Sequence, residues 1–384
     1  MREGFFIIDT DTHVGPNVET LEQFAGPILR RRWDELLPYY QPVTVGHHLS
    51  INPMPYKRQL NTSGDEVVAE SGGEIPLRGK TQLNYTVKPA SGVNDENWQG
   101  RLDDMDREGR DVDVIIPATF ATAASVLDPE LQRELYSAYH HYLDMYCGSA
   151  PDRLKATILA SGQDPEWSAQ EIKRLAGEPW AACVTPVLQE GLPADDPSLE
   201  PIWQAMEEAD LGIMHHSFFY EPPYFPGYRD IWGNLAIARA AAHPWGAQRL
   251  LAYVLLSGLL DRYPNLRIAF SECSAGWVGG WLNRLQYQQA YLQTSLPETD
   301  QTPIEYAQSG RIFCGVELDE GPVITKSVMD VVGDGVLMYS SDYPHGGCRY
   351  PESPDVVLAW EEHLGRPALE KLFTDNAKRY LRLP

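Results

Sequence analysis

Eight short apolar segments with the composition of β-strands alternate with segments of helical periodicity along this chain. The alternation predicts a parallel sheet, because each helix supplies the crossover between two neighbouring strands. Eight such units in 384 residues predict a (β/α)8 barrel, a fold of the α/β class. The expected strands are Phe5–Asp9, Val112–Pro117, Leu154–Ala160, Ala181–Leu188, Leu211–His216, Leu266–Ser271, Ile312–Val316 and Val336–Ser341.

A doubly wound open sheet is the alternative arrangement for the same alternation. We favour the barrel because polar residues cluster at the carboxyl ends of both the first and the last strand. In a barrel, that end of the strands carries the active site. The expected helices are Leu102–Arg110, Pro129–Tyr146, Pro165–Ala176, Pro197–Asp210, Ala247–Tyr263, Ala275–Leu292 and Pro322–Val331.

Residues 37–100 interrupt this rhythm, since they are rich in Pro, Gly, Asn and Ser and show no sustained period. Their aromatic residues argue against a disordered linker, so we expect a long insertion after the first strand that covers the barrel mouth. Residues 354–384 are expected to form two or three helices that seal the barrel. The prediction is one domain over residues 1–384, with 37–100 as its lid.

The charge balance excludes several classes of partner. The chain has 54 acidic and 31 basic residues, a formal net charge of −23, so it lacks the basic footprint that nucleic acids or anionic membranes require. Its five cysteines are scattered without a CxxC motif, which favours reduced thiols over a disulfide framework. No window approaches 18 uninterrupted apolar residues. We expect a cytoplasmic protein that acts on a small molecule.

Candidate metal ligands lie at the ends of three expected strands. Asp11 and His13 follow the first strand two positions apart, which places them on one face of an extended chain. His215 and His216 end the fifth strand with their rings on opposite faces, so one of them can join the same site. Asp342 follows the last strand, where a poorly solvated carboxylate needs a cation or a catalytic role. This mixed set predicts one Zn²⁺ or Mn²⁺ with an open position for water.

Further candidates lie close to these ligands in the sequence. Glu272 ends the sixth strand, where it can act as a general acid or base, orient a ligand histidine, or stabilise a helix N-terminus. His345 is expected to bind a substrate carboxylate or to donate a hydrogen bond to the site. Tyr220 and Trp232 lie in a Pro-rich loop, where they either line the pocket of an aromatic substrate or pack the loop itself. His243 is a weaker candidate, and surface positions are expected for His140, His141 and His363.

Other site classes leave no trace in the sequence. It contains neither GxGxxG at a strand–helix junction nor GxxxxGK[ST], and no Gly-x-Ser-x-Gly elbow.

Several motifs together resemble the amidohydrolase superfamily, in particular the branch of aminocarboxymuconate-semialdehyde, γ-resorcylate and 5-carboxyvanillate decarboxylases. The resemblance covers nearly the whole chain outside residues 37–100, and its Ser-Asp-Tyr-Pro-His and Tyr-Pro-Asn-Leu-Arg motifs are quite specific for this branch. The matching segments are Ile8–His13, Leu211–His216, Gly258–Ile268, Ser340–His345 and Asp375–Leu381.

The resemblance implies a (β/α)8 barrel with one divalent metal ion, and frequently a homodimer. It implies Asp11, His13, His216 and Asp342 as the metal ligands, which selects His216 over its neighbour. The chain departs from the family pattern twice. Asp11 stands where the family usually has an opening histidine, and Glu272 stands where it has a histidine on the sixth strand.

Three hypotheses about function follow. The first is a non-oxidative decarboxylase or related C–C lyase for a carboxylated aromatic compound or its ring-cleavage product, in which Asp342 protonates the ring carbon. The second is a hydrolase of an amide, ester, lactone or C–C bond, in which Asp342 or Glu272 takes a proton from a metal-activated water. The third is a binding or scaffold protein built on a barrel whose catalytic site is no longer functional. This hypothesis is suggested by Glu272, which stands where the family has a histidine.

Overall fold

The protein is described by a computed structural model, which covers residues 1–42, 46–49, 59–60, 66–67, 87–89, 97–117, 121, 127–188, 191–217, 235–345 and 347–384. Eight parallel strands form one sheet in the order β1-β6-β7-β8-β9-β10-β11-β12. The strands follow chain order, as a (β/α)8 barrel requires. They are β1 (Ile8–Val14), β6 (Val112–Pro117), β7 (Leu154–Ser161), β8 (Ala181–Val187), β9 (Gly212–His216), β10 (Ile268–Ser271), β11 (Ile312–Val316) and β12 (Leu337–Tyr339).

The first and last strands meet and close the barrel. Thr10 Oγ1 donates to Tyr339 O at 2.9 Å, and the backbone N–H of His13 donates to Tyr343 O at 2.7 Å. Thr12 and Tyr343 form a parallel bridge. The predicted barrel is therefore confirmed, and the open doubly wound sheet is excluded.

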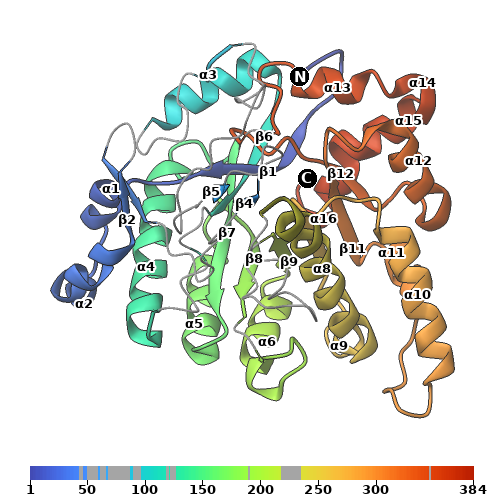
Figure 1. Cartoon of the computed structure of the whole chain (residues 1–384), viewed down its shortest axis with the longest axis horizontal. Coiled ribbons are helices and arrows are strands. Elements are labelled where there is room, and N and C mark those ends of the chain that lie inside the picture. The colour runs from blue at the N-terminus through green and yellow to red at the C-terminus, as the bar shows by residue number, and fades with distance from the viewer. Residues whose placement is uncertain are drawn as a thin grey trace.

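Helices surround the strands, and Figure 1 shows α4, α5, α6 and α8 side by side on the outside of the sheet. The helices between strands are α3 (Trp98–Glu108), α4 (Pro129–Tyr146), α5 (Pro165–Leu175), η3 (Pro197–Leu199), α6 (Glu200–Glu208), α8 (Leu235–Leu256), α9 (Leu259–Arg262), α10 (Val278–Tyr291), α11 (Pro303–Gln308) and α12 (Gly321–Val332). Three of them begin with an Asp-Pro pair, at Asp128, Asp164 and Asp196. In each, the aspartate side chain accepts backbone N–H groups while proline occupies the first helical position.

The first strand differs from the expected Phe5–Asp9. It runs from Ile8 to Val14, so Asp11 and His13 belong to the strand itself. The pairing of β1 with β6 shifts register between Asp9 and Thr12, which marks a bulge. The apolar pattern ends the expected strand at Asp9 because buried strands normally consist of apolar residues, but β1 continues through the polar run with every residue buried.

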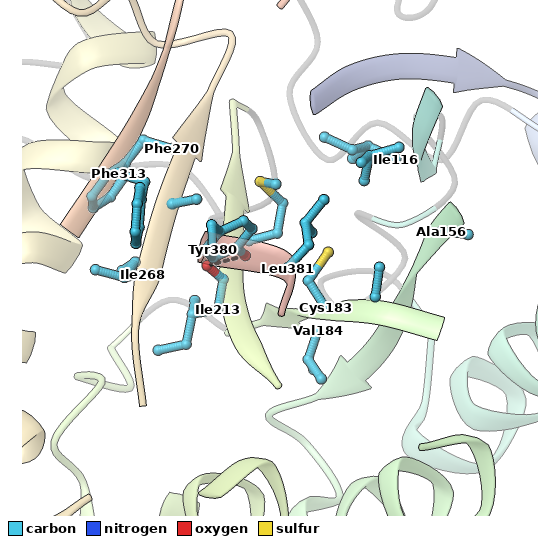
Figure 2. Packing of buried hydrophobic residues seen from close by; sticks show 14 of the residues in the cluster. Ile116, Ala156, Cys183, Val184, Ile213, Ile268, Phe270, Phe313, Tyr380 and Leu381 are labelled. Carbon is cyan, nitrogen blue, oxygen red and sulfur yellow. Dashed lines mark hydrogen bonds between the residues drawn. The ribbon is translucent and has the colours of Figure 1, made fainter. Parts of the chain in front are cut away.

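The C-terminal segments seal the amino ends of the strands, as expected. Tyr380 points between the ends of neighbouring strands in Figure 2, and its hydroxyl donates to Ile213 O at 2.8 Å. Gly212 makes this approach possible, because a Cβ there would lie 2.6 Å from the Tyr380 ring. The segments are α13 (Ser353–Leu358), α14 (Glu361–Leu364), α15 (Arg366–Glu370), the π-helix η4 (Lys371–Asp375) and α16 (Asn376–Leu381).

Most of the expected insertion lies outside the described residues. Before it come α1 (Val18–Gln23), α2 (Pro27–Arg32) and η1 (Trp33–Tyr39), which the sequence did not predict. Within residues 37–100 the structure gives two short hairpins, formed by β2 (Tyr40–Pro42) with β3 (His47–Leu49) and by β4 (Gln59–Leu60) with β5 (Glu66–Val67). The lid and the single domain therefore stay predictions. Among the described residues, no helix has the length and apolar character needed to cross a membrane.

Candidate metal centre

Two side chains of β1 form the base of the candidate site. Asp11 and His13 are each 1% exposed, and His13 Nε2 lies 3.3 Å from Asp11 Oδ1. The other ring nitrogen, His13 Nδ1, lies 3.2 Å from the backbone oxygen of Ile116 on β6. A proton on Nδ1 satisfies this contact and leaves Nε2 as the ring atom that faces Asp11 and can bind a cation.

His216 joins this pair from the end of β9. Its Nε2 lies 3.6 Å from Asp11 Oδ1, and its ring meets the His13 ring edge-on at 5.0 Å. His216 Nδ1 lies 2.9 Å from Ser217 O, which fixes the ring in the orientation that a metal ligand needs. His215 instead packs edge-on against Phe270, with 5.6 Å between the ring centroids. Burial lowers the pKa of His215 to about 3, and the positive charge of His216 and His243 contributes to this shift. Of the two histidines, the structure brings His216 to Asp11 and His13.

Asp342 lies beyond the end of β12, which stops at Tyr339 and not at the expected Ser341. Its backbone has φ 58°, the left-handed conformation that a residue with a Cβ rarely adopts. Asp342 Oδ1 lies 3.1 Å from His13 Nε2 and 2.6 Å from His345 Nδ1. Burial raises the pKa of this carboxyl, but His345 and His13 outweigh burial and hold the pKa well below its usual range.

His345 forms the exposed side of the site. Its side chain is 46% exposed, and its ring stacks on the His13 ring with 4.2 Å between centroids. The backbone N–H of His345 also donates to Asp342 O at 2.7 Å. A molecule that enters the site from solvent therefore meets His345 before it meets the buried residues.

The donors form two overlapping groups, and His13 belongs to both. One group is Asp11, His13 and His216, and the other is His13, Asp342 and His345. Within each group, the ligand atoms lie within 4.8 Å of one another. The four ligands expected from the sequence are thus assembled around the His13 ring.

The residues present fit a divalent cation. Asp11 Oδ1 and His13 Nε2 are buried, and neither makes a hydrogen bond of good geometry within the described part of the chain. Burial lowers the pKa of His13, but the carboxylates of Asp11 and Asp342 outweigh it and raise this pKa to about 10. The site therefore attracts positive charge strongly, and its mixture of imidazole and carboxylate donors suits Zn²⁺ or Mn²⁺.

Glu272 faces the same site from the residue after β10. Its backbone has φ 50°, and its Oε2 lies 3.2 Å from His216 Nε2. Ser217 Oγ donates to the same carboxylate oxygen at 2.5 Å. Burial raises the pKa of Glu272, whereas the nearby His216 lowers it, and the net pKa is below its ordinary value.

Two other carboxylates accept the backbone N–H groups ahead of the helix that Glu272 was expected to stabilise in one of its alternative roles. Glu320, from the segment after β11, accepts the backbone N–H groups of Ala275 and Gly276 at 2.8 Å. Its neighbour Glu317 accepts the N–H of Ser274 at 2.7 Å. Sequence reasoning missed both, because residues more than 40 positions away give no local signal of this contact.

Ser217 was also missed, although it immediately follows the two histidines that end β9. It contacts the site twice, since its backbone oxygen meets His216 and its hydroxyl holds Glu272. A hydroxyl directly after a candidate ligand histidine was the available signal.

The remaining candidates have different outcomes. Tyr220 and Trp232 lie outside the described residues. His243 lies within α8, and no group of candidate ligands among the described residues contains it. His141 and His363 are exposed as expected. The expectation for His140 is wrong, because this side chain is fully buried between β7 and Glu171.

The sequence pattern of the amidohydrolase family matches residues 8–383. The chain belongs to this family. The match spans all eight strands, and it confirms the resemblance inferred from the motifs. A comparison with curated proteins by sequence gives no match.

Solved structures of several amidohydrolase-type proteins share this fold. The 5-carboxyvanillate decarboxylase from Sphingomonas paucimobilis is 20% identical with a TM-score of 0.68, and the alignment covers 99% of this chain and 100% of that one. The 2,6-dihydroxybenzoate decarboxylase from Rhizobium is 18% identical with a TM-score of 0.62, covering 99% of each chain. A dihydroxybenzoic acid decarboxylase from Polaromonas sp. JS666, solved with manganese and the inhibitor 2-nitroresorcinol, is 16% identical with a TM-score of 0.64, covering 99% and 97%.

Proposed function

We propose that this amidohydrolase-family protein is a divalent-metal-dependent decarboxylase of a carboxylated aromatic compound. The observation that carries the proposal is the position of Asp342, whose carboxylate is 23% exposed and lies 3.1 Å from His13 Nε2 and 2.6 Å from His345 Nδ1. It can contact both a metal ion and the half-exposed face of the site. The similar structures named above support the substrate class, because their names state decarboxylases of hydroxylated benzoates.

Asp11, His13, His216 and Asp342 would hold the ion, for which Mn²⁺ and Zn²⁺ are the candidates. When bound, the ion would supply positive charge that anchors the substrate carboxylate and a neighbouring hydroxyl. The manganese found in the Polaromonas enzyme and in a 5-carboxyvanillate decarboxylase from Novosphingobium aromaticivorans supports Mn²⁺.

The protein side chains would handle the proton. His345 hydrogen-bonds Asp342, so the pair can share one proton and Asp342 can deliver it to the ring carbon that bears the carboxylate. A C–H bond forms at that carbon, its bond to the carboxylate breaks, and the electron pair returns to the ring as CO₂ leaves. One proton is consumed for each CO₂ released, and solvent resupplies it through the exposed His345.

Glu272 would act as a general acid or base beside the ion, since its carboxylate lies 3.2 Å from the ligand nitrogen of His216 and accepts a hydrogen bond from Ser217. We also propose a small aromatic substrate in contact with His345, Tyr220 and Trp232. A homodimer, a cytoplasmic location and one domain with a lid over residues 37–100 complete the proposal.

The test is incubation of Mn²⁺- and Zn²⁺-loaded protein with hydroxylated benzoates and, in parallel, with lactones, esters and amides. The decarboxylase is supported if the hydroxylated benzoates release CO₂ and the lactones, esters and amides produce no acid. Acid production without CO₂ would replace it with the hydrolase hypothesis.

Asp342→Asn should lower kcat for CO₂ release by about a thousandfold, because it removes the proposed proton carrier. Asp330→Asn is the matched control, since the Asp330 side chain on α12 is 62% exposed and pairs with Lys326. An Asp342→Asn variant with wild-type turnover would remove this residue from its proposed role.

A further inference from the structure

Tyr343, the residue after Asp342, is fully buried and contacts two buried arginines. The guanidinium of Arg110 lies 4.5 Å from the centre of the Tyr343 ring, and that of Arg101 lies 5.2 Å away. The Tyr343 hydroxyl donates to Asp104 Oδ2 at 2.6 Å. The side chain next to the candidate proton carrier is thus fixed at its ring and at its hydroxyl.

Both arginines are themselves held by buried carboxylates. Arg101 Nε donates to Asp113 Oδ2 at 2.9 Å, and Arg110 Nε donates to Glu108 Oε2 at 2.7 Å. Arg110 also donates to Asp113. None of these four charged side chains is exposed to solvent. Each positive charge therefore has a negative partner, which a buried arginine requires.

The same residues hold the backbone of the candidate ligand His13 on both sides. Arg101 Nη1 donates to His13 O at 2.8 Å, and the His13 N–H donates to Tyr343 O at 2.7 Å. One residue before Tyr343 and two before His13, the Asp342 N–H donates to Asp11 O at 3.1 Å. Regular β12 ends at Tyr339, so these contacts replace the missing sheet ladder where both segments carry ligands.

We propose that Arg101, Arg110 and Tyr343 are positioning residues that fix Asp342 against His13 and so set the metal affinity of the site. We call these three residues the clamp. Two fully buried guanidinium groups carry a large desolvation cost, and apolar side chains of similar volume often stabilise a protein as well or better. Their placement directly behind two ligand-bearing segments explains why charged groups are used there. The inference rests on the proposed metal site but not on the proposed reaction.

Tyr343 and Tyr350 provide a matched pair of variants. Both side chains are fully buried, and both hydroxyls donate to Asp104 at 2.6 Å, one to each carboxylate oxygen. Tyr343 directly follows Asp342 in the chain and contacts both arginines with its ring, whereas Tyr350 lies seven residues further on and packs against the Tyr343 ring with 5.7 Å between centroids. Tyr343→Phe and Tyr350→Phe should therefore have similar effects on stability and different effects on the metal site.

The experiment measures Mn²⁺ binding to metal-free protein by isothermal titration calorimetry, without substrate, together with the melting temperature of each variant. We expect Tyr343→Phe to raise the Mn²⁺ Kd about tenfold, the scale typical of residues that orient ligands, and Tyr350→Phe to change it less than twofold. Arg101→Lys keeps the charge but loses the forked contact between Asp113 and His13 O, so it should also raise the Kd about tenfold.

The proposal is overturned if Tyr343→Phe and Arg101→Lys are folded and bind Mn²⁺ as the wild type does. It is also overturned if Tyr350→Phe weakens binding as much as Tyr343→Phe, or if the wild type does not bind Mn²⁺. The reaction is assayed separately by CO₂ release. Variants that differ in Mn²⁺ affinity in a protein that releases no CO₂ support the clamp and refute the decarboxylase.

Discussion

Replacing the buried His140 with leucine should destabilise the protein by about 3 kcal/mol, a loss assembled from two hydrogen bonds. His140 lies on α4 and is fully buried. Its Nε2 accepts the backbone N–H of Leu159 on β7 at 2.9 Å, and its Nδ1 lies 2.8 Å from Glu171 Oε1 on α5. The ring must carry its proton on Nδ1, and burial, partly opposed by Glu171, lowers its pKa and keeps it neutral.

The magnitude follows from what leucine leaves behind. The Leu159 N–H becomes a buried donor without its acceptor, which costs about 1–3 kcal/mol. Glu171 loses one hydrogen bond to a charged group, worth about 1.5–3 kcal/mol, and keeps its two contacts with Arg174. The larger apolar surface of leucine offsets about 1–2 kcal/mol of this loss.

The assay is urea unfolding at pH 7.5, followed by tryptophan fluorescence and circular dichroism, with amide hydrogen exchange of the peptide that contains Leu159. His141→Leu is the control, because this adjacent histidine on α4 is exposed and should cost less than about 0.5 kcal/mol. Faster exchange at Leu159 should accompany the loss in the His140 variant. If His140→Leu and His141→Leu unfold at the same urea concentration, the assignment of His140 as a link between β7 and α5 is refuted.

Three further predictions concern the site and its support. Ser217→Ala should raise the Mn²⁺ Kd about tenfold in calorimetry, because the hydroxyl that holds Glu272 is lost. Burial, Glu320 and Glu272 raise the pKa of Glu317 to about 7, although its contacts with Ser274 oppose this. The Glu317 carboxyl is therefore ionised more readily in the unfolded chain than in the folded one. The unfolding free energy of the wild type should fall by about 2 kcal/mol as pH rises from 4.5 to 7. In melting curves, Glu317→Gln should reduce this dependence of stability on pH. Removal of metal by a chelator should abolish CO₂ release, and Mn²⁺ at a hundredfold excess over Kd should restore activity and add about 2.7 kcal/mol to the unfolding free energy.

The barrel could be predicted because parallel strands are buried on both faces and therefore appear as apolar runs. Helix boundaries were less accurate where one residue controls them. The expected helix Ala247–Tyr263 is divided into α8 and α9 at Gly258, whose φ of 69° suits glycine. The missed helix α11 is only six residues long and begins at a Thr302–Glu305 capping box, a signal that was present in the sequence.

The candidate ligands could be predicted because they lie within or after the carboxyl-terminal part of the barrel strands, which the fold brings to one edge. Their supporting contacts could not, because each depends on a partner distant in sequence. His140 resembles a polar surface residue of α4 until Leu159 and Glu171 are placed against it. Glu272 resembles a helix-stabilising residue until Glu320 is found in that role.

Asp342 and Glu272 combine a strained backbone with a side chain that faces the site. Both residues have positive φ, 58° for Asp342 three residues after the end of β12 and 50° for Glu272 directly after β10. Glycine would adopt this conformation without strain, whereas a residue with a Cβ pays about 1–3 kcal/mol for it. The backbone conformation alone would favour glycine at these two positions. The presence of a carboxylate is therefore explained by the contacts of its side chain. The apolar strands predict the course of the backbone. At Asp342 and Glu272, a less stable backbone conformation is the cost of placing charged groups around His13.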